Sequence, residues 1–352
     1  MSKKINFLQL SSPLIILFLV LSCSNEPTIV DHTDSEQTNE SIEFFNSEYL
    51  IDVVKLKETL GDKTIKIIEV SKNKVFMEGH IPKALNLWRP AYETDEPLGY
   101  TGMKASKEKL ESSLQRIGIN QGDRIILYDK KGGSDAMRMA WLLDLYGHQD
   151  YQLLDGGFKD WELHKFPIDQ KVYIQGSGNF KFTTNENMDS YISFDEMKKA
   201  VDSGSALLVD TRELEEYKGQ PFEKMGHIYS YKRGAFDYGT IPDAIHFNWS
   251  ENVDMHKDGK LKSVKDIKFN FKKAGISPDK DIILFCHSGS RSSHTTFVLR
   301  KLLGYKKVKN YDGSWIEWSH KFKNGEDIKL WKQTSEEEHE QLKSNLKNSQ
   351  SG

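Results

Sequence analysis

The stretch that decides the fold is residues 281–293, which read DIILFCHSGSRSS. Its four apolar residues, 282–285, predict a short strand buried on both faces, because no polar residue alternates with them. A cysteine comes next, then a loop with one glycine, and then a run that predicts a helix from near Ser292 to Leu303. This order of strand, loop and helix is typical of an α/β fold with a parallel sheet.

An earlier part of the chain repeats this pattern at a fixed offset. Residues 124–129 (RIILYD) parallel residues 281–286 (DIILFC), so Asp129 stands 157 residues before Cys286. Residues 155–161 (DGGFKDW) and 312–318 (DGSWIEW) keep the offset of 157, and residues 79–84 (GHIPKA) and 239–244 (GTIPDA) are offset by 160. A constant offset over several motifs predicts two similar domains in tandem.

Each half is expected to hold the same elements. A first strand is predicted at 65–70 and again at 206–210, and a second at 125–128 and 282–285. A helix near Asp135 to Leu145 corresponds to the helix near Ser292 to Leu303. The pattern therefore predicts an α/β fold with two domains, each a central, mostly parallel sheet flanked by helices. The domains are expected at 47–170 and 191–332, joined by a linker at 171–190 and followed by a polar tail at 333–352.

Composition excludes several classes of function. The chain has 352 residues, 29% of them charged, with a net charge of −3 and both signs interspersed. It therefore lacks the basic excess that binds nucleic acid or an acidic membrane surface. Histidine, cysteine and carboxylate residues show no metal-ligand spacing, and residues 131–134 (KGGS) lack the pattern of a phosphate-binding loop. We expect no metal, no cofactor and no nucleic-acid partner.

The N-terminus has the pattern of an export signal. Lysines at positions 3 and 4 precede a mostly apolar run at 7–21, which is too short to span a bilayer comfortably. The run ends in residues 20–23 (VLSC), which resemble the cleavage motif of bacterial lipoproteins, although Leu21 is a less usual residue at its position. We predict a signal peptide at 1–22 and lipidation of Cys23, which would anchor the exported chain to the periplasmic or surface side of a bacterial membrane. The alternatives are an ordinary signal peptide cut elsewhere and an uncleaved anchor.

Residues 23–46 follow as a segment rich in Ser, Thr, Asn and acidic residues. Such a composition cannot bury a core and predicts a flexible tether. The chain has two cysteines. If Cys23 carries lipid, Cys286 is the only thiol of the mature chain, and an intramolecular disulfide is impossible.

The surroundings of Cys286 predict a reactive thiol. Sites in open α/β sheets lie at the carboxyl ends of strands, and a loop entering a helix presents backbone N–H groups and the positive end of the helix dipole. A cysteine there is expected to ionise readily, because these dipoles stabilise the thiolate. Gly289 lets successive amides converge on one point. The alternative is a buried structural thiol at the end of a strand.

These motifs resemble those of tandem rhodanese-domain sulfurtransferases, the family of thiosulfate and 3-mercaptopyruvate sulfurtransferases, over roughly residues 48–330. The resemblance is carried by residues 79–82, by the loop 286–292 and by residues 312–318. It implies that Cys286 is the catalytic nucleophile, and that the first domain, with Asp129 at the cysteine position, is inactive. The expected active-site loop consists of His287, Ser288, Gly289, Ser290, Arg291 and Ser292, and the expected donor-binding residues are Arg212, Arg233 and Arg291.

The chain departs from the family pattern at several points. Thr240 replaces the usual histidine of the second GHIP motif, and Asp243 replaces the usual glycine. Glu69 stands where many members have aspartate, and the stretch 219–238 is longer than the family core needs. None of these departures affects the nucleophile, but the insert could reshape the mouth of the site.

The resemblance implies transfer of sulfur from a small-molecule donor to a thiophilic acceptor through a persulfide on Cys286. Thiosulfate is the favoured donor because Arg291 makes the loop basic, and 3-mercaptopyruvate is the alternative. A cysteine phosphatase is a rival, but its pattern has His before Cys and a longer loop, whereas here Phe285 precedes the cysteine and four residues separate it from Arg291. A non-enzymatic sulfur-carrier module is a further rival.

Overall fold

The computed structural model describes residues 43–173, 176–219, 222–224, 227–229 and 234–331. The predicted signal peptide, most of the predicted tether with Cys23, the predicted donor-binding residue Arg233 and the predicted polar tail lie outside the described residues.

The first domain is built around a parallel sheet of five strands. Its order is β1-β5-β4-β2-β3, and every paired neighbour runs parallel. The strands are β1 (Leu50–Ile51), β2 (Ile65–Val70), β3 (Leu85–Leu87), β4 (Arg124–Tyr128) and β5 (Tyr151–Leu154). The helices are α1 (Val53–Thr59), α2 (Asn73–Met77), α3 (Lys107–Arg116), α4 (Ser134–Leu145) and α5 (Gly157–Leu163).

The second domain repeats this topology strand for strand. Its parallel sheet has the order β6-β12-β11-β7-β10. The strands are β6 (Tyr191–Ile192), β7 (Leu207–Asp210), β10 (Ile245–His246), β11 (Ile282–Phe285) and β12 (Val308–Tyr311). The helices are α6 (Phe194–Ser203), α7 (Leu214–Lys218), α8 (Val264–Lys273), α9 (Ser290–Phe297) and α10 (Ser314–Lys323).

Shorter elements complete the described chain. The stretch 219–238 contains an antiparallel hairpin of β8 (Phe222–Lys224) and β9 (His227–Tyr229). Four 3₁₀ turns are η1 (Ser47–Tyr49), η2 (Arg89–Ala91), η3 (Met188–Ser190) and η4 (Trp249–Asn252). Helix α9 continues into a π-helical turn, η5 (Val298–Leu302). The predicted fold class, two α/β domains with parallel sheets, is confirmed.

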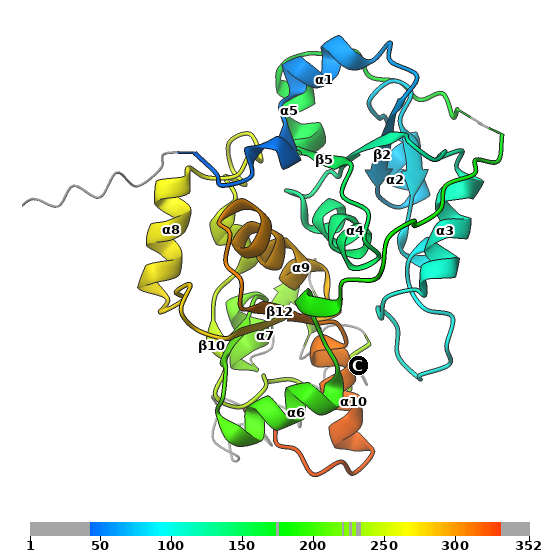
Figure 1. Cartoon of the computed structure of the whole chain (residues 1–352). Coiled ribbons are helices and arrows are strands. Elements are labelled where there is room, and N and C mark those ends of the chain that lie inside the picture. The colour runs from blue at the N-terminus through cyan, green and yellow to red at the C-terminus, as the bar shows by residue number, and fades with distance from the viewer. Residues whose placement is uncertain (1–42, 174–175, 220–221, 225–226, 230–233, 332–352) are drawn as a thin grey trace, which may run out of the picture. The chain divides into compact units, whose positions relative to one another are not determined.

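One apolar core is shared by the two domains. Helices α4 and α9 pack side by side between the two sheets (Figure 1). The core around them joins Leu142 of α4 and Leu127 of β4 to Phe297 of α9 and Leu284 of β11, all of them buried. A second cluster lies under α1 and α5, and a third under α6 and α10. Burial of apolar surface on both sides of each sheet explains why the strands carry continuous apolar runs.

A buried ion pair crosses the interface between the domains. Arg138 of α4 lies 2.5 Å from the carboxylate of Asp312, and both side chains are 1% exposed. The same carboxylate accepts a hydrogen bond from the backbone amide of Lys104 at 2.8 Å. Asp312 opens the segment 312–318, so the first domain holds the second at a point next to the loop of Cys286.

Candidate active site

Cys286 lies where the sequence predicts it, at the carboxyl end of a central strand. Strand β11 ends at Phe285, and α9 begins at Ser290. Because β11 pairs with β7 on one side and β12 on the other, the loop between them opens at the middle of the sheet edge. Gly289 has φ of +80°, a conformation that glycine adopts at low cost, and it turns the chain into the helix.

The loop surrounds the thiol with hydrogen-bond donors. The hydroxyl and amide of Ser292 and the amide of Ser288 donate to the sulfur of Cys286, and the charge of Arg291 lies nearby. Burial opposes ionisation of the thiol, but Arg291 and these donors outweigh it, and the pKa of Cys286 lies below its ordinary value. The thiol is therefore predisposed to be a thiolate.

Arg291 is held by a carboxylate that the sequence did not reveal. Its Nη1 and Nη2 donate to the two oxygens of Glu216 in α7, at 2.6 and 3.0 Å. Burial lowers the pKa of the guanidinium, and the Glu216 charge outweighs that effect and raises it. This bidentate ion pair fixes the position of Arg291 beside Cys286. It also occupies two nitrogen atoms of the guanidinium group that was expected to bind the donor.

Arg212 is likewise engaged within the protein. Its Nε and Nη2 donate to the carboxylate of Asp210 at 2.6–3.0 Å, and Nη2 also donates to the carbonyl of Gly239 at 2.7 Å. The guanidinium packs over the ring of Trp315 and is 2% exposed. Thr240, which replaces the expected histidine, donates its hydroxyl to Asp210 at 2.7 Å. These contacts give Arg212 a place in the wall under the loop, and its contact with a donor stays a prediction.

Ser314 supports the loop from below. Its hydroxyl accepts hydrogen bonds from the backbone amides of Cys286 and Gly289, both at 3.1 Å, and donates to the carbonyl of Tyr311 at 2.8 Å. Ser314 adopts a positive φ of 50° to do so. The sequence analysis used residues 312–318 only as a repeat and family motif, and the folded geometry reveals Ser314 as the acceptor for two loop amides.

The first domain covers the outer side of the loop. Arg89 of η2 donates to the hydroxyl of Ser288 at 3.3 Å and to Asp135 at 2.9 Å. Gly102 lies so close to Ser288 that a methyl group on it would stand 2.6 Å from the serine Cβ. Cys286 is 1% exposed. The first domain therefore contributes to the burial of the thiol.

Two further residues of the predicted loop line this region. His287 is 6% exposed, and its carbonyl accepts the amide of Ile316 at 3.1 Å. The hydroxyl of Ser290 is buried and has no hydrogen-bond partner among the described residues. Ser290 is the first residue of α9.

The corresponding loop of the first domain, between β4 and α4, also directs backbone amides at one side chain. Asp129 occupies the position of Cys286 and is 2% exposed. Its two oxygens accept hydrogen bonds from four backbone amides at 2.7–3.0 Å, those of Lys131, Gly133, Asp135 and Ala136. Burial and then the charge of Asp135 raise the pKa of Asp129. The backbone amides of Lys131, Ala136 and Gly133 oppose this effect in part, so the loop directs its donors at one side chain, and in this domain that side chain is Asp129.

Within the described ranges, no group of three or more His, Cys, Asp or Glu residues is placed to hold a metal ion. The helices in those ranges are all too short or too polar to cross a membrane.

Comparison with known proteins identifies both halves. Residues 52–164 and 193–321 each match the model of the rhodanese-like domain. The sulfur carrier protein TtuD of Thermus thermophilus is 30% identical over 282 residues, which cover 79% of this chain and 95% of that protein. The thiosulfate sulfurtransferase of Corynebacterium glutamicum is 29% identical over 282 residues, 79% of this chain and 90% of its own.

Solved structures share the fold. The 3-mercaptopyruvate sulfotransferase SseA of Escherichia coli superimposes with a TM-score of 0.62 and 24% identity, over 76% of this chain and 98% of its own. Both halves of the present chain are therefore built on the architecture found in that protein.

Proposed function

The chain belongs to the rhodanese-like domain family, and on this premise we propose that it is a sulfurtransferase that moves sulfane sulfur from thiosulfate through a persulfide on Cys286. The observation that carries the proposal is the thiol itself. It lies at the end of β11, its pKa is lowered, and it accepts hydrogen bonds from Ser288 and Ser292. The carboxylate of Asp129 occupies the matching position in the first domain, where backbone amides donate to it.

The first step is attack of the Cys286 thiolate on the outer sulfur of thiosulfate. A sulfur–sulfur bond forms to the cysteine, the sulfur–sulfur bond of thiosulfate breaks, and its electron pair leaves with sulfite. The amides of Ser288 and Ser292 then hold the negative terminal sulfur of the persulfide. We expect the hydroxyl of Ser290, which has no hydrogen-bond partner among the described residues, to bind an oxygen of the leaving sulfite.

The second step returns the enzyme to its thiolate form. Cyanide or a thiolate attacks the terminal sulfur, the persulfide bond breaks, and its electron pair returns to Cys286. The product is thiocyanate or a new persulfide. The cation of Arg291 supports the thiolate as a leaving group because it lowers the pKa of Cys286.

The donor has two candidates. The name of the Corynebacterium relative favours thiosulfate, and the fold shared with SseA allows 3-mercaptopyruvate. The pairing of Arg291 with Glu216 weakens the argument for thiosulfate from charge alone, because part of the cation is neutralised. The name of the Thermus relative, a sulfur carrier protein, favours the alternative of a sulfur-carrier module.

Kinetics with defined donors test the proposal. We expect thiocyanate to form from thiosulfate and cyanide, with kcat/KM for thiosulfate above that for 3-mercaptopyruvate, and no turnover in Cys286→Ser. A preference for 3-mercaptopyruvate would change the donor and keep the mechanism. Hydrolysis of p-nitrophenyl phosphate by the wild type, with no thiocyanate formed from either donor, would instead support the phosphatase.

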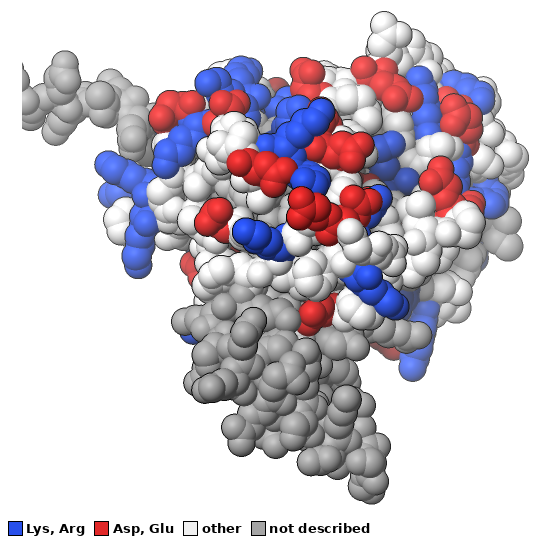
Figure 2. Space-filling view, turned by 90° about the horizontal axis from the view of Figure 1, so that it is seen from below, with Lys and Arg blue, Asp and Glu red and all other residues white. Residues whose placement is uncertain are grey.

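The cellular location is a separate proposal. Residues 1–23 favour export and lipidation at Cys23, so the domains would work outside the cytoplasm at a bacterial membrane. Mass spectrometry of the mature N-terminus tests this. An acylated Cys23 supports it, whereas a free N-terminus at another residue, or an uncut chain, contradicts it. Basic and acidic residues alternate over the surface seen in Figure 2, so the described surface there presents no single-sign patch to a membrane.

A further inference from the structure

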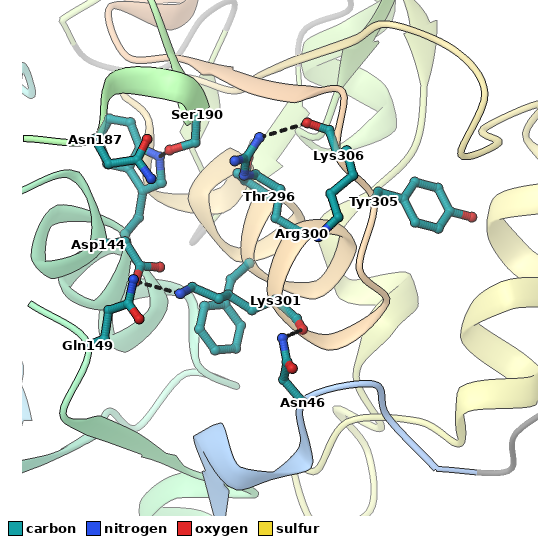
Figure 3. A pocket seen from close by; sticks show the side chains of 12 residues that line it. Asn46, Asp144, Gln149, Asn187, Ser190, Thr296, Arg300, Lys301, Tyr305 and Lys306 are labelled. Atoms are coloured by element: carbon teal, nitrogen blue, oxygen red, sulfur yellow. Dashed lines mark hydrogen bonds and ion pairs between the residues drawn. The ribbon is translucent and has the colours of Figure 1, made fainter. Parts of the chain in front are cut away.

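A polar cavity of about 190 Å³ lies between the domains, away from the loop of Cys286. It is bounded by the C-terminal half of α4, by η3, by the end of α9 with η5, and by the segment that leads into the first domain (Figure 3). Trp141 of α4 closes one side, where its indole N–H donates to the hydroxyl of Ser190 at 3.0 Å. Helix α9 rises about 1.5 Å per residue, so the cavity lies roughly 15 Å along it from the cysteine loop.

The cavity contains a cation, Arg300, that forms no ion pair with any carboxylate of the described residues. Arg300 donates through Nη1 to the carbonyls of Lys306 and Val308, at 3.1 and 2.9 Å. Burial lowers the pKa of Arg300, and the more distant charges of Asp189 and Asp144 offset this effect only in part. Asp144, the acidic residue that lines the cavity, forms an ion pair with Lys301 at 2.8 Å and accepts a hydrogen bond from the hydroxyl of Tyr151. A half-buried guanidinium with only carbonyl partners is stabilised by an anion.

A buried hydroxyl beside Arg300 also lacks a partner. Thr296 lines the cavity one helical turn before Arg300 and is 1% exposed. Its Oγ1 has no hydrogen-bond partner among the described residues. An unpaired hydroxyl in the interior is unfavourable, so a ligand atom that hydrogen-bonds to it is stabilised. This orphan hydroxyl is independent of the argument from charge.

The backbone between these two side chains is unusual. Residues Val298–Leu302 form a π-helical turn instead of continuing α9. Such turns insert one residue into a helix and occur often at functional sites. Here the turn presents Arg300 to the cavity and Lys301 to Asp144, as the dashed contacts of Figure 3 show.

From the cavity, the cation without a close ion pair and the hydroxyl without a hydrogen-bond partner, we propose that this chain binds a small organic anion between its domains. Its carboxylate or phosphate group pairs with Arg300, with exposed Lys306 at the rim, and its polar body bonds Thr296 and the side-chain amide of Asn187. The volume admits a ligand larger than a simple ion. The ligand joins α9 to η3 and α4, and therefore bridges the two domains at a distance from the sulfur chemistry.

Titration calorimetry on the folded chain tests the proposal, with malonate and inorganic phosphate as probes and malonamide as a neutral match for malonate. We expect one saturable site per chain for at least one of the two anions, and none for malonamide. Arg300→Gln is expected to weaken binding at least tenfold. Lys307→Gln is the control, because Lys307 is an exposed lysine next to Lys306 that does not line the cavity, and it should bind as the wild type does.

Hydrogen exchange localises the bound probe. Protection is expected at 187–190 and 296–306 and not at 286–292. If Arg300→Gln fails to fold, Thr296→Val keeps the test decisive, because it removes only the orphan hydroxyl and should weaken binding several-fold. Failure of both anions to saturate the wild type, protection confined to the cysteine loop, or equal weakening in Lys307→Gln would overturn the proposal. None of these results bears on thiocyanate formation, so the proposed function is judged separately.

Discussion

The thiol of Cys286 depends on a cation that is itself held by a carboxylate. Arg291 favours the thiolate, and Glu216 fixes Arg291 with two short hydrogen bonds. The carboxylate therefore has two opposed effects on the sulfur. It positions the cation next to the sulfur, and its negative charge reduces the net field that the sulfur experiences.

The pH dependence of Cys286 follows from the direction of its pKa. An ordinary cysteine ionises at about pH 8.5, and in this fold the pKa is lower. The reactive thiolate is present above the folded pKa and is lost as the pH falls through it. We expect the rate of alkylation by iodoacetamide to reach its plateau at a lower pH than the rate of glutathione measured beside it. A midpoint at or above that of glutathione would show that burial dominates the environment of the thiol.

Charge substitutions on either side of Arg291 should shift that midpoint in opposite directions. Arg291→Gln removes the cation, so the pKa of Cys286 is expected to rise. Glu216→Gln keeps the cation and removes the opposing charge, so the pKa is expected to fall. Each variant leaves a buried charge without its partner, which costs about 3–5 kcal/mol of unfolding free energy.

The double variant supplies the control for the pair. The double variant leaves neither charge without its partner. We therefore expect its loss of unfolding free energy, measured in urea, to be smaller than the sum of the losses in the two single variants. Additive losses, with shifts of the alkylation midpoint in one common direction, would contradict the pairing seen here.

The order of strand, loop and helix in β4–α4 and β11–α9 could be predicted from the sequence, and the strand bounds almost to the residue. Apolar runs gave the strands, and β2 and β11 have the predicted bounds, Ile65–Val70 and Ile282–Phe285. The constant offset of 157 residues placed Asp129 at the position of Cys286. Local patterns suffice for such units, because chain neighbours form them.

Contacts between distant elements could not be predicted in this way. Glu216 reaches Arg291 across 75 residues, and Arg138 of the first domain reaches Asp312 of the second. Charged residues of this kind look like solvated surface in a sequence, since no periodicity marks the partner. The end of α9 is a further example, because the predicted helix continues to Leu303 but the last turn, Val298–Leu302, is π-helical.

The turn at Gly289 gives a prediction with a matched control. Gly289 and Gly275 have nearly the same φ, +80° and +77°, so alanine at either position bears the same backbone cost of about 1–2 kcal/mol. A methyl group at Gly289 would stand 2.6 Å from Nη1 of Arg138, whereas at Gly275 it meets nothing within 4 Å.

We therefore expect Gly289→Ala to lose about 1–3 kcal/mol more unfolding free energy than Gly275→Ala, and to slow persulfide formation, which Gly275→Ala should leave unchanged. Urea unfolding and the rate of thiocyanate release measure the two effects. Equal losses of unfolding free energy and equal rates in the two variants would mean that Arg138 can move away from a methyl group at position 289 at little cost.

The two domains share one apolar core, and we therefore expect them to unfold together. Phe297 and Leu284 of the second domain lie in the same apolar cluster as Leu142 and Leu127 of the first. The ion pair of Arg138 with Asp312 adds a buried polar contact across the same interface. A domain without independent closure of its core is expected to unfold together with its neighbour.

Calorimetry of the protein with both domains should therefore show a single unfolding transition. Far-ultraviolet circular dichroism and tryptophan fluorescence should change together at that transition. The tryptophans report on both halves, since Trp161 lies in the first domain and Trp315 and Trp318 in the second. Two separate transitions would show that the interface does not couple the unfolding of the two domains.

The most direct test of the account is mass spectrometry of the intact chain after treatment with thiosulfate. One added sulfur atom, mapped to Cys286 and removed by cyanide, is the predicted result. Cys286→Ser should gain none, and Asp129→Ala should gain it as the wild type does, because the loop of Asp129 in the first domain takes no part in the transfer. Sulfur found elsewhere, or a Cys286 that gains no sulfur in a folded chain, would contradict the role assigned to this thiol.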